Sequence, residues 1–551
     1  MSKKSFLISA AVSAAGTAGA AFAVKNKIKQ KMQTENGKKE VLDLADRTVM
    51  KAVSVLAGKV SDKCIPYLDL FEAPGCMEGS GYFLTQPAEN ARWSLGFAKG
   101  VVIPEEYSGD LYIGGYLAFP PNKASGKITD QLIRAIAVDD GSGRGINVFA
   151  VIDCIGLANA DVRKIRDMLS DVIAEKNVVS VNISATHCHS GVDTEGLWGD
   201  LIKAVRTNPK AVKNKKTIEN VSSGRNKEFM DFLYETARQT ITEAINGMVP
   251  GKLSFALKDG SEFVHGKRPP YKTDDVMTVL RFVPDDGTKE LRAVFLAAHP
   301  TCYGDRQREI SADYPFFICS ELEENGYNAV FFQGDQAAVA TSRGKFTPEG
   351  STTHQSVEAY GRGLARYVIE SGENEYKDIA PYINVRIKEV LIPADNPILT
   401  LAGKLKLVNN NVAKISMDDK KDYELCFPTE VGYVELGSEL RLALIPGEMC
   451  PELNVGGTFS AKESYTGKGW DYPALKDVTD GRLTVIGLCN DEIGYIVPDN
   501  DFGSIFAPLH YEESVSAGRR TASNIVAGFI RAVEDGKHSA ILGHDHIQEN
   551  V

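Results

Sequence analysis

The sequence predicts an α/β fold in which mixed β-sheets are layered with helices in one large domain. Short apolar runs rich in β-branched residues alternate with segments whose apolar residues recur every three or four positions, which indicates strands and helices in turn. A unit of hairpin, strand, helix and strand occurs twice, and this alternation is typical of mixed α/β layers. With 43% hydrophobic and 25% charged residues, the 551-residue chain has a globular composition.

The N-terminal region differs from the rest of the chain. Lys3 and Lys4 precede an Ala-, Gly- and Ser-rich apolar run over 6–24. This order is typical of a secretory signal, and the run is also nearly long enough to span a bilayer. We therefore expect residues 1–24 to be a signal peptide or membrane anchor, and the protein to be secreted or membrane-anchored, outside the cytoplasm. A surface helix is the alternative.

The remaining boundaries follow from changes in composition. Residues 25–63 begin with lysines and continue with apolar residues at helical spacing, which predicts a basic tether and an amphipathic helix. We expect the main domain over 64–537 and a polar tail over 538–551. The Lys- and Asn-rich segment 201–227 predicts an exposed insertion, and its place close behind His189 also fits a lid or a membrane-facing patch.

The main domain contains two similar units and a strand-rich last third. Each unit has a hairpin, a helix and a further strand, predicted over 134–138, 146–153, 162–173 and 178–187, and again over 276–283, 291–298, 316–324 and 329–332. The last third predicts a hairpin, a strand and a closing helix over 431–437, 439–445, 483–488 and about 512–533. The likeness between the two units is architectural, since their sequences do not repeat.

Two histidines follow the strand of the first unit in a His-x-His spacing. His187 and His189 come directly after a β-branched run, and a glycine follows them. Imidazole is the commonest neutral metal ligand, and strand ends are frequent places for catalytic groups. Taken alone, the motif is equally compatible with a turn that carries two solvated histidines.

Other apolar strands also end in groups that bind metals. His299 follows the second apolar strand of the second unit, Glu448 follows the hairpin of the last third, and Tyr495 follows its final strand. Two imidazoles, a carboxylate and a phenolate suit a catalytic zinc, which takes nitrogen and oxygen ligands and keeps one position for water. The nine cysteines contain no Cys-x-x-Cys, so a zinc knuckle or a thioredoxin-type motif is disfavoured. A Cys64–Cys76 disulfide stays open for an exported protein, and we interpret several of the others as buried packing residues.

These motifs, in this order, resemble the neutral/alkaline non-lysosomal ceramidases and their bacterial relatives over about residues 85–535. The residues that carry the resemblance are Thr186-His187-Cys188-His189-Ser190-Gly191, Gly196-Leu197-Trp198-Gly199, His299-Pro300-Thr301, Ala312-Asp313-Tyr314, Gly334-Asp335, Pro446-Gly447-Glu448 and Gly494-Tyr495-Ile496-Val497-Pro498. The resemblance implies a single large catalytic domain of the neutral ceramidase type that cleaves an amide (N-acyl) bond.

The same resemblance implies a set of site residues. Zn²⁺ is held by His187, His299, Glu448 and Tyr495, and His189 lies beside it for substrate binding or proton transfer. In this family an Asn-x-Tyr-x-x-Tyr pattern is frequent at the last of these positions. Glu492 replaces its first tyrosine and is therefore an alternative site residue. Zinc lowers the pKa of bound water to about 7, so that hydroxide attacks a carbonyl.

Asp313 and Asp335 are candidates to orient the ligand imidazoles. For both, a strand-end or helix-cap role is the alternative, and it is strong for Asp313, which precedes a predicted helix. One departure from the family concerns the residues after Asp335: the family pattern Gly-Asp-Val-Ser-Pro reads Gly-Asp-Gln-Ala-Ala here, so Ala337 stands in place of the serine. Ceramide as the substrate is therefore open.

We expect a small-molecule or lipid amide as the substrate and contact with a membrane surface. The net charge of −11 does not favour nucleic acid, and the oligomeric state stays open. The alternative function is a catalytically weakened envelope binding protein that keeps the fold. A metallo-β-lactamase-type hydrolase fits less well, because position 191 is glycine, and a serine hydrolase lacks its Gly-x-Ser-x-Gly motif.

Overall fold

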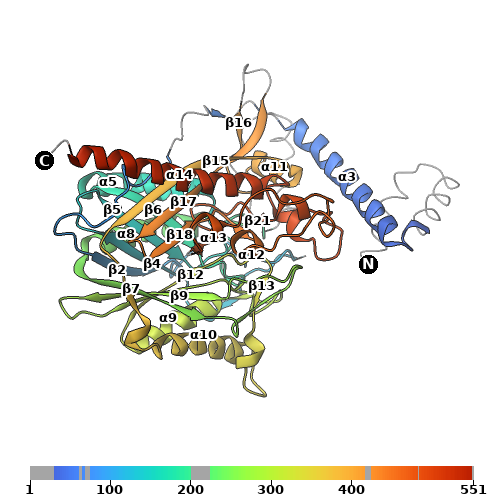
Figure 1. The fold of residues 1–551 in the computed structure, drawn as a ribbon. Helices are drawn as coiled ribbons and strands as arrows, with labels where there is room; N and C mark the ends of the chain where they lie inside the picture. Colours follow the sequence, from blue (N-terminus) through green and yellow to red (C-terminus); the bar gives the residue numbers. More distant parts are fainter. Residues whose placement is uncertain are drawn as a thin grey trace.

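The chain folds into four layers, helix, sheet, sheet and helix, in the computed structural model (Figure 1). The structure describes residues 30–60, 62, 65–68, 75–118, 120–199, 224–415, 423–481 and 483–548. The expected signal or anchor over 1–24 and most of the insertion over 201–227 lie outside these residues. Among the described helices, none combines the length and the apolar character needed to cross a bilayer.

The larger sheet has nine strands in the order β12-β10-β9-β7-β2-β4-β5-β6, with β14 beside β7. The strands are β2 (Ser94–Val101), β4 (Leu132–Asp139), β5 (Ile146–Ile152), β6 (Val178–Ala185), β7 (Val249–Asp259), β9 (Val276–Pro284), β10 (Leu291–Leu296), β12 (Asn328–Gln333) and β14 (Lys377–Asp378). The pairs β5–β6 and β10–β12 are parallel, and the other pairs in this sheet are antiparallel. The two predicted units therefore form the two ends of one mixed sheet.

The smaller sheet has six strands and comes mainly from the last third of the chain. Its order is β1-β16-β17-β18-β20, with β15 beside β17. The strands are β1 (Tyr67–Leu68), β15 (Ile383–Pro393), β16 (Ala413–Ile415), β17 (Glu424–Leu436), β18 (Leu440–Leu444) and β20 (Thr484–Ile486). Helix α14 (Thr521–Gln548) covers its outer face and crosses β15 and β17 in Figure 1.

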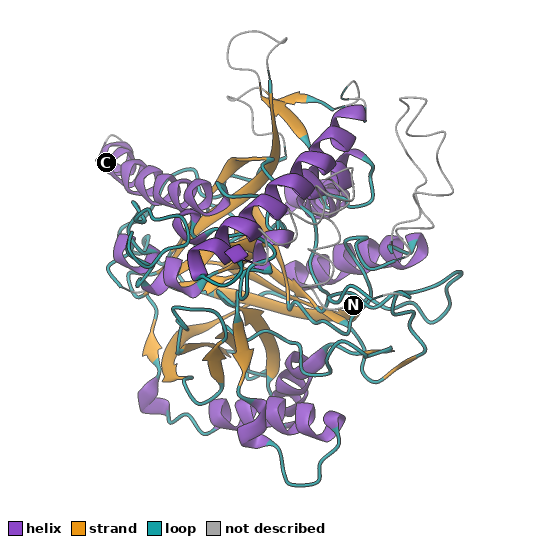
Figure 2. Cartoon of the chain, turned by 90° about the vertical axis from the view of Figure 1, so that its right-hand side faces the viewer, coloured by secondary structure: helices purple, strands orange, loops and turns teal. Residues whose placement is uncertain are grey.

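Apolar side chains fill all three interfaces between the layers. Phe149 and Phe282 of the larger sheet pack with Ile387 and Val434 of the smaller one. The outer face of the larger sheet is covered by α4 (Asn159–Met168), α8 (Lys227–Asn246), α9 (Asp313–Glu324) and α10 (Thr353–Ile369). Figure 2 shows the strands enclosed between these helices and those on the opposite side. Burial on both faces explains why most strands are continuous apolar runs.

Two helices differ from their predicted extents. The helix predicted over 162–173 is split into α4 and α5 (Ser170–Lys176), because Leu169 leaves the helical conformation. The closing helix begins at Thr521 and continues to Gln548, into the segment predicted as a polar tail. Residues 512–515 form the short 3-10 turn η4 (Glu512–Val515), and Gly518, at φ +146°, separates this turn from the helix.

Helix α3 (Glu35–Lys59) projects from the body of the molecule in Figure 1. It begins after Thr34, whose side chain accepts a hydrogen bond from the backbone N–H of Gly37. One face packs against α11 (Pro397–Lys404), while Val55 and Leu56 on the other face are more than half exposed. The amphipathic helix predicted within 25–63 therefore has an apolar surface that the described residues leave open to solvent.

The larger sheet curls until its two edge strands, β6 and β12, contact each other. The side-chain amide of Gln333, at the end of β12, donates to the carbonyl of Thr186, just beyond β6, at 3.2 Å. A short bridge between Ser184 and Cys489 attaches the last third of the chain to the same edge. This closure brings the ends of three distant segments to one place.

Candidate metal centre

Three imidazoles converge where the curled sheet closes. Among the described residues, His187, His189 and His299 form a group of side chains close enough together to hold a metal ion. Their ring centroids are 4.7 to 4.8 Å apart. The Nε2 atom of His189 lies 3.1 Å from that of His187 and 2.9 Å from that of His299. His187 follows β6, and His299 follows β10, as the positions of the strand ends predict.

Glu448 supplies a fourth donor atom. It begins the short strand β19 (Glu448–Met449), which pairs in parallel with β21 (Tyr495–Ile496) so that Glu448 lies opposite Tyr495. Its Oε2 atom is 3.2 Å from Nε2 of His187 and 3.5 Å from Nε2 of His299. Ligands of a tetrahedral zinc, at about 2.0–2.1 Å from the ion, lie roughly 3.3 Å from one another. The four donors therefore have the spacing that such an ion requires.

The backbone, and not a carboxylate, orients the imidazoles. The Nδ1 atom of His187 is 2.5 Å from the carbonyl oxygen of Ile155 and donates to it, so its Nε2 carries a lone pair. A backbone hydrogen bond with Gln336 acts on His299 in the same sense. The ring of His189 packs against Gly115, without a fully formed hydrogen bond at Nδ1. The lone pairs on Nε2 of His187 and His299 therefore face Nε2 of His189, which donates a hydrogen bond in one tautomer and offers a third lone pair to a cation in the other.

The electrostatics of the site favour the unprotonated imidazoles of His189 and His299. Burial lowers the pKa of His299 to about 4 and outweighs the opposing effect of Glu448. Burial, with His187 and His299 beside it, lowers the pKa of His189 well below its usual value. Burial alone would raise the pKa of Glu448, but the imidazole of His187 reverses this and the pKa is lowered. Neutral imidazoles and an ionised carboxylate are the forms that bind metals.

Tyr495 lies beside Glu448 but is not part of the imidazole group. Its hydroxyl is hydrogen-bonded to the Glu448 carboxylate and to Tyr511. Burial and the charge of Glu448 raise the pKa of Tyr495 well above 10, so the phenol keeps its proton. His189 therefore occupies the place among the donors that the family resemblance gives to Tyr495.

The two aspartates expected to orient imidazoles contact other groups. Asp313, at φ +56°, accepts from the backbone N–H groups of Cys302 and Tyr314 and so joins the loop after His299 to the start of α9. Asp335 accepts from the side-chain amide of Asn454. In the described part of the chain, neither carboxylate is hydrogen-bonded to His187, His189 or His299. Both side chains are buried, and the contacts of Asp313 join a loop to the first turn of α9.

A cavity of about 540 Å³ opens from the imidazoles, and most of its lining is apolar. Apolar side chains at its walls include Leu117, Leu197, Trp198, Ile398, Val408 and Phe427. Helix α11 contributes Ile398 and Leu399, so the wall is continuous with the helix that packs against α3. Ala338 and Val339 line the cavity next to Ala337, where the family pattern has its serine.

The cavity lining includes residues that were not predicted from the sequence, among them Gly115, Glu195 and Lys267. Glu195 lies between Asp193 and Gly196, so the family motif marks its neighbourhood but not its role. Lys267 lies before a Pro-rich loop and no motif marks it. Glu492 also lines the cavity, and its Oε1 accepts from the backbone N–H of Gly494 at 2.8 Å.

The four cysteines closest to these motifs are free thiols with buried side chains: Cys188, Cys302, Cys450 and Cys489. Burial raises the pKa of each of them, so they remain protonated. This supports the interpretation that they are packing residues.

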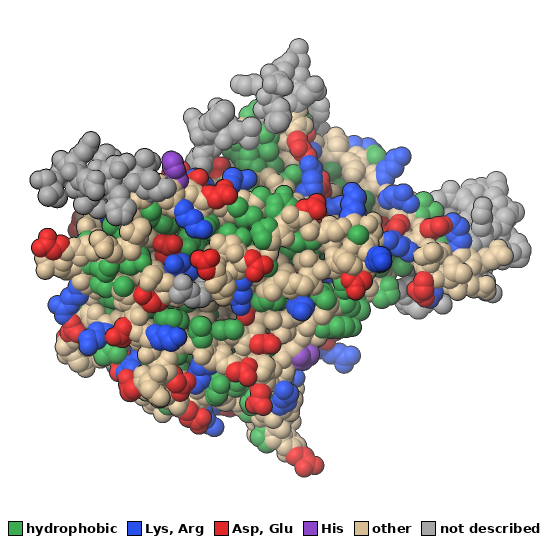
Figure 3. Space-filling view, in the orientation of Figure 1, with side chains coloured by type: hydrophobic (Ala, Val, Ile, Leu, Met, Phe, Trp, Pro, Cys, Tyr) green, Lys and Arg blue, Asp and Glu red, His purple; other side chains and the backbone are tan. Residues whose placement is uncertain are grey.

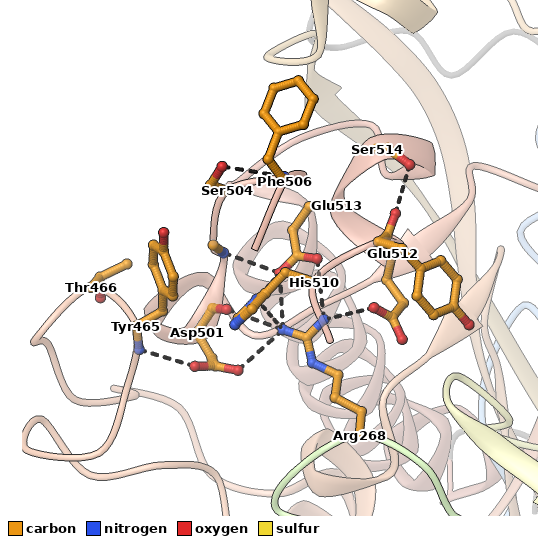
Figure 4. A network of polar contacts seen from close by, with 12 residues as sticks. Arg268, Tyr465, Thr466, Asp501, Ser504, Phe506, His510, Glu512, Glu513 and Ser514 are labelled. Carbon is orange, nitrogen blue, oxygen red and sulfur yellow. Dashed lines mark hydrogen bonds and ion pairs between the residues drawn. The ribbon is translucent and has the colours of Figure 1, made fainter. Parts of the chain in front are cut away.

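A buried ion-pair network lies next to residues that line the cavity (Figure 4). Arg268, next to Lys267, binds Glu512 at 3.1 Å, Glu513 at 2.9 Å and Asp501 at 3.1 Å. His510 contacts the same Glu513 carboxylate at 2.7 Å. Burial of Arg268 opposes its charge, but Glu513 and the other carboxylates raise its pKa. We call this set the Arg268 network, which joins the segment after strand β8 (Val264–Gly266) to the turn η4.

Comparison with known proteins supports the fold. No protein-family model matches the chain. The structure is similar to neutral ceramidase from Pseudomonas aeruginosa, with a TM-score of 0.58 and 15% sequence identity over 81% of this chain and 74% of that one. It is also similar to a ceramidase complexed with C2, with a TM-score of 0.59 and 14% identity over 81% of this chain and 75% of that one. The chain therefore has the neutral ceramidase fold, and at this identity the likeness concerns the fold alone.

Proposed function

We propose that this protein is a metal-dependent hydrolase that cleaves an amide (N-acyl) bond, with Zn²⁺ as the metal and a ceramide-like or other N-acyl lipid as the substrate class. The observation that carries the proposal is the convergence of three imidazole Nε2 atoms and one carboxylate oxygen at the inner end of a cavity. The likeness to neutral ceramidases supports an amide as the scissile group.

The donor set fits a zinc ion in its chemistry and spacing. His187, His189, His299 and Glu448 would hold the ion, with His189 as a ligand in place of the proton-transfer role expected from the family. The ion would lower the pKa of bound water and polarise the substrate carbonyl. Tyr495 keeps its proton and lines the cavity, so we assign it to donate a hydrogen bond to the carbonyl oxygen of the substrate.

The apolar walls suit a long acyl chain. Burial of such a chain against side chains such as Leu197, Val408 and Phe427 contributes about 0.8 kcal/mol per methylene. A substrate of this kind resides in a membrane. The exposed apolar residues of α3, close to the expected signal or anchor, support contact with a membrane surface and a location outside the cytoplasm. Fractionation of cells and mass spectrometry of the mature N-terminus would test this location.

Metal content and hydrolysis of a panel of acyl amides and esters test the proposal together. We expect about one equivalent of zinc in the purified protein and loss of hydrolysis when a chelator removes it. His187→Ala and His299→Ala should lose the metal and lower kcat/KM by at least about 100-fold. His265→Ala, at an exposed side chain outside the cavity, is the matched control and should keep both the metal and the activity.

Tyr495→Phe separates the two roles of this tyrosine. A variant that keeps the metal but has a kcat lowered by about 10- to 100-fold would support a hydrogen-bond donor. Loss of the metal in this variant would instead make Tyr495 a ligand, as the family resemblance implies.

The second candidate is a binding protein of the envelope with little or no turnover. Ala337 in place of the family serine and Glu492 in place of a tyrosine favour it. Stoichiometric metal and tight binding of acyl amides without hydrolysis of any of them would support this function over the hydrolase.

A further inference from the structure

Two carboxylates that the proposed reaction does not use face each other in the cavity. Glu195 and Glu492 both line it, and each side chain is only 7% exposed. Both occupy the space that a side chain on Gly156 would need. A Cβ atom placed on Gly156 would overlap Oε1 of Glu195 and lie 2.7 Å from Cβ of Glu492. The lack of a side chain at Gly156 therefore lets the two acids approach each other.

These acids differ from the structural acids around them. Asp193 accepts hydrogen bonds from the backbone N–H groups of Glu195, Gly196 and Trp198. Asp491 accepts from the N–H groups of Asn159 and Glu492. By contrast, Oε1 of Glu195 and Oε2 of Glu492 are buried and have no hydrogen-bond partner in the described part of the chain. A buried carboxylate oxygen without a partner is costly unless a ligand supplies one.

The local field at this pair is negative. Burial raises the pKa of Glu195 well above its usual value, and Asp193 and Glu448 add to the effect. Burial, with Glu448 and Glu195 nearby, does the same for Glu492. Arg225, whose guanidinium binds Asp161, opposes the rise in the pKa of Glu195 without reversing it. Lys267 acts on the imidazoles of His189 and His299.

We propose that Glu195 and Glu492 form a subsite for a positively charged group, such as an ammonium, on the amine part of the substrate. The inference rests on the proposed function and names its substrate class: an N-acyl compound whose amine part is cationic. The acyl chain lies along the apolar walls, and the scissile bond lies at the imidazoles. The amine part then reaches the two carboxylates, which accept its N–H groups.

A matched pair of amides tests the subsite. N-lauroyl-1,4-diaminobutane carries an ammonium where N-lauroylpentylamine carries a methyl group of similar size. We expect the wild-type protein to prefer the cationic amide by about tenfold or more in kcat/KM, as for a buried charged hydrogen bond. In Glu195→Gln and Glu492→Gln this preference should fall towards one. Glu309→Gln, an exposed acid outside the cavity, is the control and should keep it.

Binding of the same two amides, measured by calorimetry, makes the outcome independent of turnover. If the wild-type protein binds the cationic amide more tightly and both variants lose this preference, the subsite is supported. Absence of hydrolysis of both amides would contradict the proposed hydrolase but not the subsite. Equal binding of the two amides by the wild-type protein would overturn the subsite. A second equivalent of bound metal that is lost in Glu195→Gln and Glu492→Gln would also overturn the subsite, because the two carboxylates would then bind a metal ion and not the substrate. Circular dichroism checks that both variants fold.

Discussion

Gly115 decides how the ring of His189 is held. Its φ is +101°, and a Cβ atom at this position would overlap Nδ1 and Cγ of that imidazole. His187 has φ +64°, an uncommon value for a residue with a side chain and of a kind that concentrates at functional sites. The positions of at least two imidazoles thus depend on backbone conformations that side-chain patterns do not reveal.

Gly115→Ala should therefore displace His189. We expect a lower metal affinity and a loss of about 1–3 kcal/mol in the free energy of unfolding, from backbone strain and overlap together. Zinc titration and denaturant unfolding measure the two effects. Gly143→Ala is the matched control, since Gly143 also has a positive φ (+79°) but no atom near the added methyl group. Equal losses of metal affinity and of unfolding free energy in both variants would show that the methyl group of Gly115→Ala does not displace the His189 ring.

The buried imidazole of His299 should make stability depend on pH in the metal-free protein. Its pKa is lowered to about 4, whereas an unfolded histidine titrates near 6.5. As the pH falls below 6.5, the unfolded state binds the proton first, so the free energy of unfolding decreases until about pH 4, by roughly 3 kcal/mol in total. Denaturant unfolding of wild-type protein and His299→Gln at pH 7, 6 and 5 measures this. If the free energy of unfolding falls equally steeply with pH in the two proteins, the prediction is contradicted.

At the scale of elements, the sequence was most informative where strands are buried on both faces. The runs predicted over 276–283 and 291–298 correspond to β9 and β10, because short, mainly apolar runs bounded by turn residues favour strands buried on both faces. Strand ends then located His187 and His299. The sequence could not reveal the partners of Asp313, since a carboxylate before a helix serves equally as a cap or as a support for a ligand.

The start of α9 should contribute to the loop that carries His299. Asp313→Ala leaves the buried N–H groups of Cys302 and Tyr314 without an acceptor, at a cost of about 1–3 kcal/mol. We expect a lower free energy of unfolding and a weaker zinc affinity. Thr352→Ala, which removes the cap of α10 far from the site, should cost about 1 kcal/mol and leave zinc affinity unchanged. Unchanged affinity in both variants would separate Asp313 from the site.

At the scale of the whole molecule, the curled sheet is what no local pattern predicts. The strands β6 and β12 are the two edges of the larger sheet, and their contact depends on twist accumulated over eight strands. The cavity residues Glu195 and Lys267 come together only through this closure. On the face shown in Figure 3, acidic and basic side chains are interspersed, so the net charge of −11 is spread and not gathered into one patch there.

The Arg268 network should stabilise the assembled molecule. Arg268→Met leaves Asp501, Glu512 and Glu513 buried without their cation, so we expect the free energy of unfolding to fall by about 3–5 kcal/mol. Thermal unfolding compared with Arg520→Met provides the check, because Arg520 pairs with Asp395 and Glu424 in solvent and should cost less than about 1 kcal/mol. Similar decreases in the free energy of unfolding for Arg268→Met and Arg520→Met would mean that burial does not strengthen the Arg268 network.

The order of the donors along the chain has a consequence for biosynthesis. A growing polypeptide has made all three histidines by residue 299, but Glu448 and the strand that aligns it arrive only after a further 150 or so residues. Under the proposed function, a ribosome-bound or truncated product would lack one of the four proposed ligands and would bind zinc weakly. Tight metal binding would then follow the docking of the C-terminal third of the chain.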